Sequence, residues 1–165
     1  MEIRIRPYTA DDLPPILEII NYNILHSTAL YDYRERTLEQ QQALFEDKLQ
    51  KGFPIYVAIC QDVVIGFGYY SEFRFREAYK YTVEHSVYAH PNWQGKGVGK
   101  LLLNQLIEQA KKQGIHTLIG VIDSENVNSI AFHERMGFEI QGVLKETGFK
   151  FDRWLHSVFV QRIIH

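Results

Sequence analysis

A glycine-rich segment at residues 93–100, WQGKGVGK, stands directly before a run of apolar residues with helical spacing. Glycines let backbone N–H groups approach an anion closely, and the first turn of a helix adds a partial positive charge. Lys96 and Lys100 can add positive charge from the rim of such a loop. The segment therefore predicts a phosphate-binding loop, and the alternative is a glycine-rich turn without a ligand.

The spacing of this segment excludes two common phosphate-binding motifs. The nucleoside-triphosphate motif G-x-x-x-x-G-K-[ST] would require a glycine at Gln94 and a hydroxyl at Leu101. The dinucleotide motif G-x-G-x-x-G would require its third glycine at Lys100 or at Leu102. The pattern that remains is Q-x-x-G-x-G, which begins at Gln94 and lies between a predicted strand and a predicted helix.

A carboxylate stands within the apolar segment that precedes this loop, YTVEHSVYAH at 81–90. Side chains alternate along a strand, so Glu84 shares a face with Ser86 and Tyr88, opposite His85. A carboxylate in a β-branched strand is unusual unless it is solvated or functional. Glu84 is therefore the candidate general base for a reaction that removes a proton, and the alternative is a solvated strand face.

His133, in the segment FHERMGF, is a second candidate for acid–base chemistry, because histidine donates or accepts a proton near neutral pH. The alternative is a histidine that is hydrogen-bonded where a helix meets the sheet. The other six histidines show no metal-ligand spacing, and we expect His85 and His156 to be packed or surface residues. Cys60 is the one cysteine, which excludes an internal disulfide, and we predict no metal site.

The segment FRFREAYKY at 73–81 alternates arginine with aromatic residues. Guanidinium groups suit a carboxylate or a phosphinate, so this segment is expected to recognise an acidic substrate. The residues expected to contact it are Phe73, Arg74, Arg76 and Tyr79. The alternative is an ordinary polar loop whose aromatic side chains pack on the sheet.

Short helices and strands must position these residues. Apolar periodicity predicts helices over 9–24, 37–52, 98–114 and 126–137, and strands over 3–8, 53–60, 63–71, 81–90, 116–123 and 138–164, the last folded around a turn. The order β-α-α-β-β-β-α-β-α-β-β predicts an α/β fold in which a mixed sheet carries helices on its faces. The 165 residues suit one domain, 1–165.

Composition narrows the class of protein. The formal net charge is -2 and no basic stripe occurs, which argues against a nucleic-acid partner. No apolar run approaches the length of a membrane span, so no membrane partner is expected. The first residues, MEIRIRPYT, lack the apolar stretch of a signal peptide, and we therefore expect a cytoplasmic protein.

These motifs together resemble the GNAT superfamily of acyl-CoA-dependent N-acetyltransferases, and within it the phosphinothricin and methionine sulfoximine N-acetyltransferases. The likeness covers nearly the whole chain and is carried by HSTALYDYRERT, VEHSVYAHPNWQGKGVGKLLL, GVIDSENVNSIAFHERMGF and GVLKETGFKFDRWLHSVFVQ. It implies a single N-acetyltransferase domain with a mostly antiparallel sheet of about seven strands, about four flanking helices and a splayed strand pair that binds CoA. It also implies acetyl-CoA as cosubstrate, a small-molecule amine as substrate and a homodimer.

The resemblance also implies residue roles. The backbone of Val87, Tyr88 and Ala89 would pair with the pantetheine arm of acetyl-CoA, and the Val87 N–H would polarise the thioester carbonyl. Asn126 and Ser129 would contact the pantetheine, although Asn126 can equally be a helix cap. The pyrophosphate would be held by the backbone of Gln94, Gly95, Lys96, Gly97, Val98, Gly99 and Lys100.

The same likeness assigns the reaction. Glu84 would be the base and His133 the donor to the leaving CoA thiolate, or a substrate contact. Tyr31 would cover the substrate, and Arg74 and Arg76 would bind its acid groups. The expected function is direct acetylation of the α-amine of a small amino-acid analogue, such as phosphinothricin, methionine sulfoximine or methionine sulfone. Another amine, such as a protein N-terminus or a polyamine, and an inactive CoA-binding sensor remain as alternatives.

Overall fold

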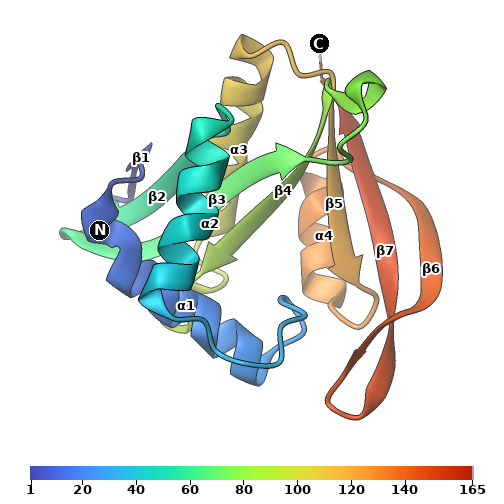
Figure 1. The fold of residues 1–165 in the computed structure, drawn as a ribbon, viewed down its shortest axis with the longest axis horizontal. Helices are drawn as coiled ribbons and strands as arrows, with labels where there is room; N and C mark the ends of the chain where they lie inside the picture. The colour runs from blue at the N-terminus through green and yellow to red at the C-terminus, as the bar shows by residue number, and fades with distance from the viewer. Residues whose placement is uncertain (165) are drawn as a thin grey trace.

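A central sheet organises the chain (Figure 1). The computed structural model describes residues 1–164, and within them seven strands form one sheet in the order β1-β2-β3-β4-β5-β7-β6. The sequence order of helices and strands is the predicted one, and every neighbouring pair in this sheet is antiparallel except β4 with β5. The strands are β1 (Arg4–Pro7), β2 (Ile55–Cys60), β3 (Val63–Glu72), β4 (Thr82–Ala89), β5 (Thr117–Asp123), β6 (Glu139–Lys150) and β7 (Arg153–Ile163).

Helices cover both faces of the sheet. Within residues 1–164 they are α1 (Leu13–His26), α2 (Leu38–Gln50), α3 (Val98–Lys112) and α4 (Val127–Arg135). In Figure 1, α1 and α2 lie on the near face and α3 on the far face, while α4 lies beside β5. The predicted capping box starts α2, because Thr37 and Gln40 each accept a hydrogen bond from the other's backbone N–H. Two buried apolar clusters follow from this arrangement, one under α3 and one under α1 and α2.

β4 and β5 separate along their length, which creates the opening that the site needs. Their parallel pairing runs only from Thr82 opposite Thr117 to Glu84 opposite Ile119. Beyond these pairs the strands diverge, as the widening between them shows (Figure 1). The predicted splayed pair is therefore confirmed.

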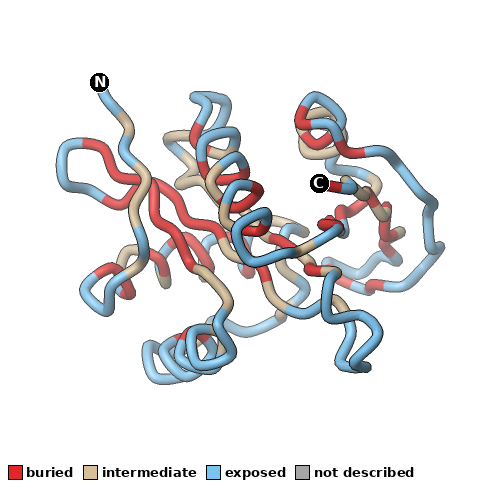
Figure 2. Tube along the Cα trace, turned by 90° about the horizontal axis from the view of Figure 1, so that it is seen from above, coloured by how far each residue is buried: buried red, intermediate tan, exposed pale blue. Residues whose placement is uncertain are grey.

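β6 forms one outer edge of the sheet and pairs with β7, which lies between β5 and β6. Most of its residues are exposed, as the pale-blue tube at one side of Figure 2 shows. Two exceptions are Gly148 and Lys150, which are buried near the end of the strand. These two positions contact the loop between α1 and α2, so the edge ribbon helps to hold that loop.

Candidate active site

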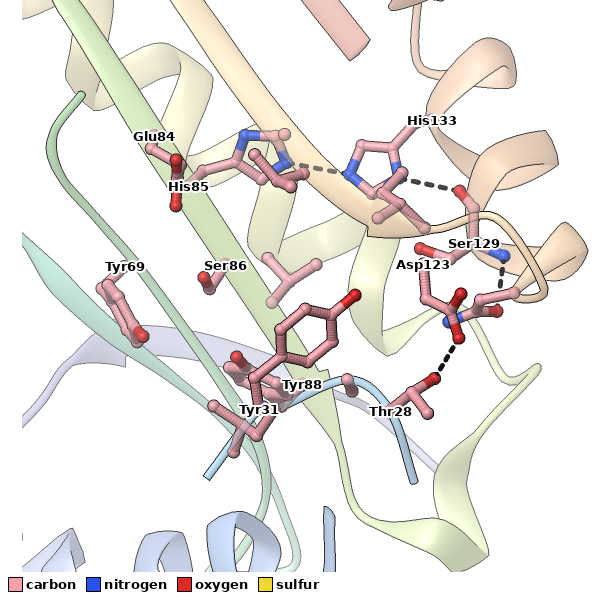
Figure 3. A pocket seen from close by; sticks show the side chains of 17 residues that line it. Thr28, Tyr31, Tyr69, Glu84, His85, Ser86, Tyr88, Asp123, Ser129 and His133 are labelled. Carbon is pink, nitrogen blue, oxygen red and sulfur yellow. Dashed lines mark hydrogen bonds between the residues drawn. The ribbon is translucent and has the colours of Figure 1, made fainter. Parts of the chain in front are cut away.

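A cavity of about 320 Å³ lies where β4 and β5 diverge. Its walls come from parts of the chain that are far apart in sequence, namely β4, the end of β5, the start of α4 and the loop after α1 (Figure 3). The side chains that line it include Thr28, Tyr31, Tyr69, Glu84, His85, Ser86, Tyr88, Asp123, Asn126, Ser129 and His133. Of the predicted catalytic residues, both Glu84 and His133 are thus brought to one cavity.

Glu84 is the carboxylate that the β4 face presents to this cavity. Its backbone pairs with Ser71 on β3, and its side chain lies on the same face as Ser86 (Figure 3). Burial raises the pKa of the Glu84 carboxyl, and the charge of Lys48 opposes that shift. A carboxylate with a raised pKa is a stronger base than an exposed glutamate, which suits proton removal near neutral pH.

The backbone of β4 presents a free edge to the opening. The amide of His90 donates to the carbonyl of Ile65 at 2.8 Å, and these two residues continue the antiparallel register of β3 and β4. Because hydrogen-bonded pairs alternate in an antiparallel ladder, the backbone of Tyr88 faces β3, whereas Val87 and Ala89 face the gap beside β5. The register therefore supports pantetheine pairing at Val87 and Ala89, and it leaves Tyr88 to line the cavity with its side chain.

The glycine-rich loop has the backbone that an anion site needs. Gly95 and Gly97 have φ values of 73° and 85°, a left-handed region that residues with a Cβ avoid. Gly97 is the N-cap of α3, and no side chain caps the first turn. The first N–H groups of a helix have no partner within it, so the amides that follow Gly97 are available to a phosphate. Lys96 lies at the same end, with its ammonium 5.1 Å from the centre of the Trp93 ring.

The start of α4 carries the two remaining predicted CoA contacts. The Asn126 side chain accepts a hydrogen bond from the Ser129 amide at 3.2 Å, so the capping role is real, and both residues line the cavity. The Ser129 carbonyl accepts a hydrogen bond from His133 Nδ1 at 2.8 Å. His133 Nε2 lies 2.9 Å from His85 Nε2, and burial lowers the pKa of His133. Both ring nitrogens of His133 are thus engaged by the protein, which favours the structural alternative over proton donation.

The loop after α1 covers one side of the cavity. Its Tyr31 ring lies on Gly148 of β6, where a Cβ would come within 2.5 Å of the ring. Lys150 is 3% exposed and donates to the carbonyls of Ser27 and Leu30 at 2.7 and 2.6 Å. Two short hydrogen bonds, Thr28 to Asp123 and Tyr33 to the Phe149 carbonyl, hold the same loop. Tyr31 therefore lines the cavity and lies against the edge ribbon, and its role as a cover for the substrate stays a prediction.

Comparison with known proteins identifies the family of this fold and cavity. The family described as Acetyltransferase (GNAT) matches residues 20–138, more than half of the chain. The chain belongs to the GNAT family. It is 41% identical over 162 residues to the L-methionine sulfoximine/L-methionine sulfone acetyltransferase of Pseudomonas aeruginosa, covering 98% of this chain and 94% of that protein. It is 36% identical to the phosphinothricin N-acetyltransferase of Alcaligenes faecalis, covering 96% of this chain and 81% of that protein.

Solved GNAT structures share the whole architecture. A phosphinothricin acetyltransferase from Sinorhizobium meliloti in complex with acetyl-CoA has a TM-score of 0.96 and 38% identity, covering 99% of this chain and 89% of that one. A ribosomal-protein-alanine N-acetyltransferase from Brucella melitensis has the same TM-score and identity, covering 98% of this chain and 99% of that one. The mixed, mostly antiparallel sheet predicted from the sequence is thus a GNAT fold.

Several predicted parts of this GNAT site do not line the cavity: Ala89, residues 94–100 and the expected substrate segment. Phe73, Arg74, Arg76 and Tyr79 lie in the segment between β3 and β4 and contribute no wall to it. Both arginines are exposed, and the Arg74 and Arg76 guanidinium carbons lie 5.4 and 5.1 Å from the ring centres of the preceding phenylalanines. The assignment of this segment to the substrate remains a prediction.

Sequence reasoning missed several polar residues in and around the GNAT cavity, among them Thr28 and Tyr69, which line it. Asp123 is buried, accepts a hydrogen bond from Thr28, and also accepts one from the Glu125 amide at 3.1 Å. Its place at the carboxyl end of a predicted strand was an available signal. No local pattern signals the buried Lys150, or the contact of His85 with His133 forty-eight positions away. Within residues 1–164, no group of three or more His, Cys, Asp or Glu side chains is placed to hold a metal ion.

Proposed function

We propose that the protein is an acetyl-CoA-dependent N-acetyltransferase that acetylates the α-amine of a small amino acid of the methionine sulfoximine, methionine sulfone or phosphinothricin type. The observation that carries the proposal is that the Glu84 carboxylate and the free backbone edge of β4 meet in one cavity. The names of the Pseudomonas and Alcaligenes relatives support the substrate class. One domain, 1–165, performs both binding and transfer in this proposal.

The residues present fit acetyl-CoA. The amides of residues 94–100, at the N-terminus of α3, would hold the pyrophosphate, because the glycines let the backbone approach an anion closely and the first N–H groups of the helix have no partner within it. Val87 and Ala89 would pair with the pantetheine as an added strand partner. Asn126 and Ser129, across the opening, would contact the pantetheine from α4. The acetyl group would then lie beside Glu84, and the Val87 N–H would stabilise charge on the thioester oxygen.

The reaction requires a neutral amine. An α-amine is mostly protonated near neutral pH, so Glu84 would remove a proton directly or through a water molecule. The nitrogen lone pair would then form a bond to the thioester carbon, and collapse of the adduct would break the carbon–sulfur bond. The CoA sulfur leaves with the electron pair as a thiolate. The amide nitrogen loses its second proton to water, and the thiolate takes up a proton from water. His133 braces the cleft in this proposal, since donation to sulfur would first require its Nε2 to leave His85.

Substrate recognition is proposed for two segments. Tyr31, held on Gly148, would cover the amino acid, and Arg74 and Arg76 would supply positive charge to its acid groups. The basic character of 73–81 counts against a polyamine, which would require an acidic site. An inactive CoA-binding sensor would not require Glu84 in the cavity wall, and its presence there counts against that alternative.

A protein N-terminus remains the second candidate substrate, because the Brucella melitensis structure carries the name of a ribosomal-protein-alanine N-acetyltransferase. A thiol-release assay with acetyl-CoA separates the candidates. Methionine sulfone, methionine sulfoximine and phosphinothricin should release CoA, whereas a peptide with N-terminal alanine and a polyamine should not. CoA binding without turnover on any amine would overturn the proposal in favour of the sensor.

Glu84→Gln tests the base directly. The variant keeps the size of the side chain but removes the carboxylate, so kcat should fall about 100-fold or more near neutral pH. In the native enzyme the rate should fall as the pH drops through the raised pKa of Glu84, because protonation removes the base. The variant should lose this dependence. Glu139→Gln, at an exposed position of β6, is the matched control and should be fully active. An unchanged rate and pH profile in Glu84→Gln would exclude it as the base.

We also propose a cytoplasmic homodimer. Apolar side chains are exposed along the outer ribbon: Trp154 is 60% exposed and packs against Phe149, and the exposed Val143 and Leu144 lie further along β6. Such a patch is typical of surfaces that associate. Sedimentation should give twice the mass of the chain, and Trp154→Lys should shift it toward the monomer.

Within residues 1–164, no helix has the length and apolar character needed to span a bilayer.

A further inference from the structure

Two buried histidines meet across the opening between β4 and α4. His85 and His133 are each 5% exposed, and their Nε2 atoms lie 2.9 Å apart (Figure 3). His85 is the first β4 residue beyond the last pairing with β5, so the contact lies where the two strands begin to separate. Gly120 on β5 leaves room for it, because a Cβ there would come within 3.1 Å of His85 Cε1.

The hydrogen bonds fix which nitrogens carry protons. A backbone carbonyl can only accept, so the contact of His133 Nδ1 with the Ser129 carbonyl requires a proton on Nδ1. Burial keeps His133 neutral by lowering its pKa, which leaves its Nε2 without a proton. The 2.9 Å contact then requires His85 Nε2 to be the donor. His85 Nδ1 must consequently be bare.

An independent observation agrees with this assignment. Among the residues that the structure describes, His85 Nδ1 is the one buried side-chain nitrogen or oxygen without a hydrogen-bond partner. A protonated Nδ1 would leave a donor unsatisfied in the interior, which is costly, whereas a bare nitrogen in the same place leaves only an acceptor unsatisfied. Burial, followed by the neighbouring His133, lowers the pKa of His85 to about 3, and an interaction of the ring with the Ile119 backbone opposes the shift. That interaction does not meet the distance and angle of a hydrogen bond, so it leaves His85 Nδ1 without a partner.

No charged group contacts either ring in the described part of the chain. Glu84 points to the opposite face of β4, and Asp123 on β5 is held by Thr28. The ring of Phe138 lies against both imidazoles, with centres 5.1 Å from His85 and 5.3 Å from His133. The pair is therefore a neutral, directional hydrogen bond in an apolar surrounding.

We propose that His85 is a positioning residue for acetyl transfer, which donates to His133 and so braces β4 against α4. The brace fixes the distance between the two walls that would enclose the pantetheine, since Val87 follows His85 by two positions on the same strand edge. His133 then donates a hydrogen bond to the Ser129 carbonyl and does not protonate the leaving sulfur. This inference rests on the proposed function only for its kinetic consequence, because the hydrogen-bond pattern exists without substrate.

Nitrogen-15 NMR of the histidine rings tests the pattern without any turnover. His133 should show a protonated Nδ1 and a bare Nε2, and His85 the reverse, from about pH 6 to about pH 8. Assignment follows from loss of one set of signals in His85→Gln and of the other in His133→Gln. Reversed tautomers, or a doubly protonated ring near neutral pH, would overturn the proposal whatever the substrate is.

Two variants of matched size test the consequence for transfer. His85→Gln keeps an N–H donor for His133 Nε2 and should retain most of kcat. His85→Leu removes the donor and leaves that nitrogen unpaired, so kcat should fall about tenfold. Thermal melting confirms that both variants fold. Equal kcat in the Leu and Gln variants would overturn the positioning role. If the unsubstituted enzyme acetylated none of the amines, that result would instead refute the proposed function.

Discussion

Substitution of Gly148 by alanine should displace Tyr31, the proposed cover of the amino-acid site, without affecting the binding of acetyl-CoA. A Cβ at Gly148 would lie 2.5, 3.1 and 3.2 Å from three carbons of the Tyr31 ring. Ordinary carbon contacts are about 3.5–4.0 Å, so the ring must move by roughly 1 Å. The backbone at Gly148 does not have a positive φ, so alanine introduces no backbone strain of its own.

The contacts around Tyr31 determine which part of the structure bears the energetic cost of that movement. The loop is fixed before Tyr31 by Lys150, which donates to Ser27 and Leu30, and by Thr28, which donates to Asp123. It is fixed after Tyr31 by Tyr33, which donates to the Phe149 carbonyl. Overpacking at such a position costs about 1–3 kcal/mol. If about 1–2 kcal/mol of this falls on the closed cover, the KM for the amine rises roughly five- to thirtyfold.

The measurement is steady-state thiol release. The amine is varied at saturating acetyl-CoA, and acetyl-CoA is then varied at saturating amine. Gly142→Ala is the control, because it lies on the same strand and a Cβ there meets nothing within 4 Å. The KM for acetyl-CoA should be unchanged in both variants, since neither touches residues 94–100. Equal amine KM values for the two variants would refute the role of Gly148 as the seat of the cover.

Two further outcomes are expected. Gly97→Ala should weaken acetyl-CoA binding and destabilise the fold by about 1 kcal/mol, because its φ is 85°. Gly142→Ala, where a Cβ meets nothing within 4 Å, should change little in isothermal titration and thermal melting. Burial would raise the pKa of Asp12, but its bonds with Arg6 and Thr9 outweigh that and lower it below 3.8. Asp12 therefore stabilises the fold above this pH and loses that contribution as the pH falls through its lower folded value. Asp12→Asn should have a lower free energy of unfolding near neutral pH, and this free energy, measured by urea titration, should fall less steeply as the pH drops. An unchanged dependence on acid pH would contradict this.

Local patterns were enough to predict the elements and one face of the site. The hydrophobic periodicity of 98–114 and the alternation of 81–90 gave α3 and β4, because both reflect geometry within a single segment. The same alternation placed Glu84 on one face and His85 on the other, as the structure confirms. It could not say what lies across the gap, since that depends on how α4 packs.

Contacts between distant segments were beyond such reasoning. Lys150 reaches a carbonyl at Ser27, and Thr28 reaches Asp123, through packing that no short window contains. The substrate role expected for 73–81 rests on composition, and in the folded chain that segment lines no part of the cavity. Composition gives the chemistry of a segment but not its position.

The sequence by itself determined the glycine-rich backbone of the proposed anion site and the position of the carboxylate. Glycines at 95 and 97 allow the positive φ values, and a glutamate in an apolar strand marks the proposed base, because each effect belongs to one residue and its neighbours. The tertiary structure alone decided that the strands separate after Glu84, and that His133 gives both its nitrogens to the protein. Hydrogen-bond partners are chosen by the packing of segments far apart in the chain, so the protonation pattern of the cleft is a property of the fold.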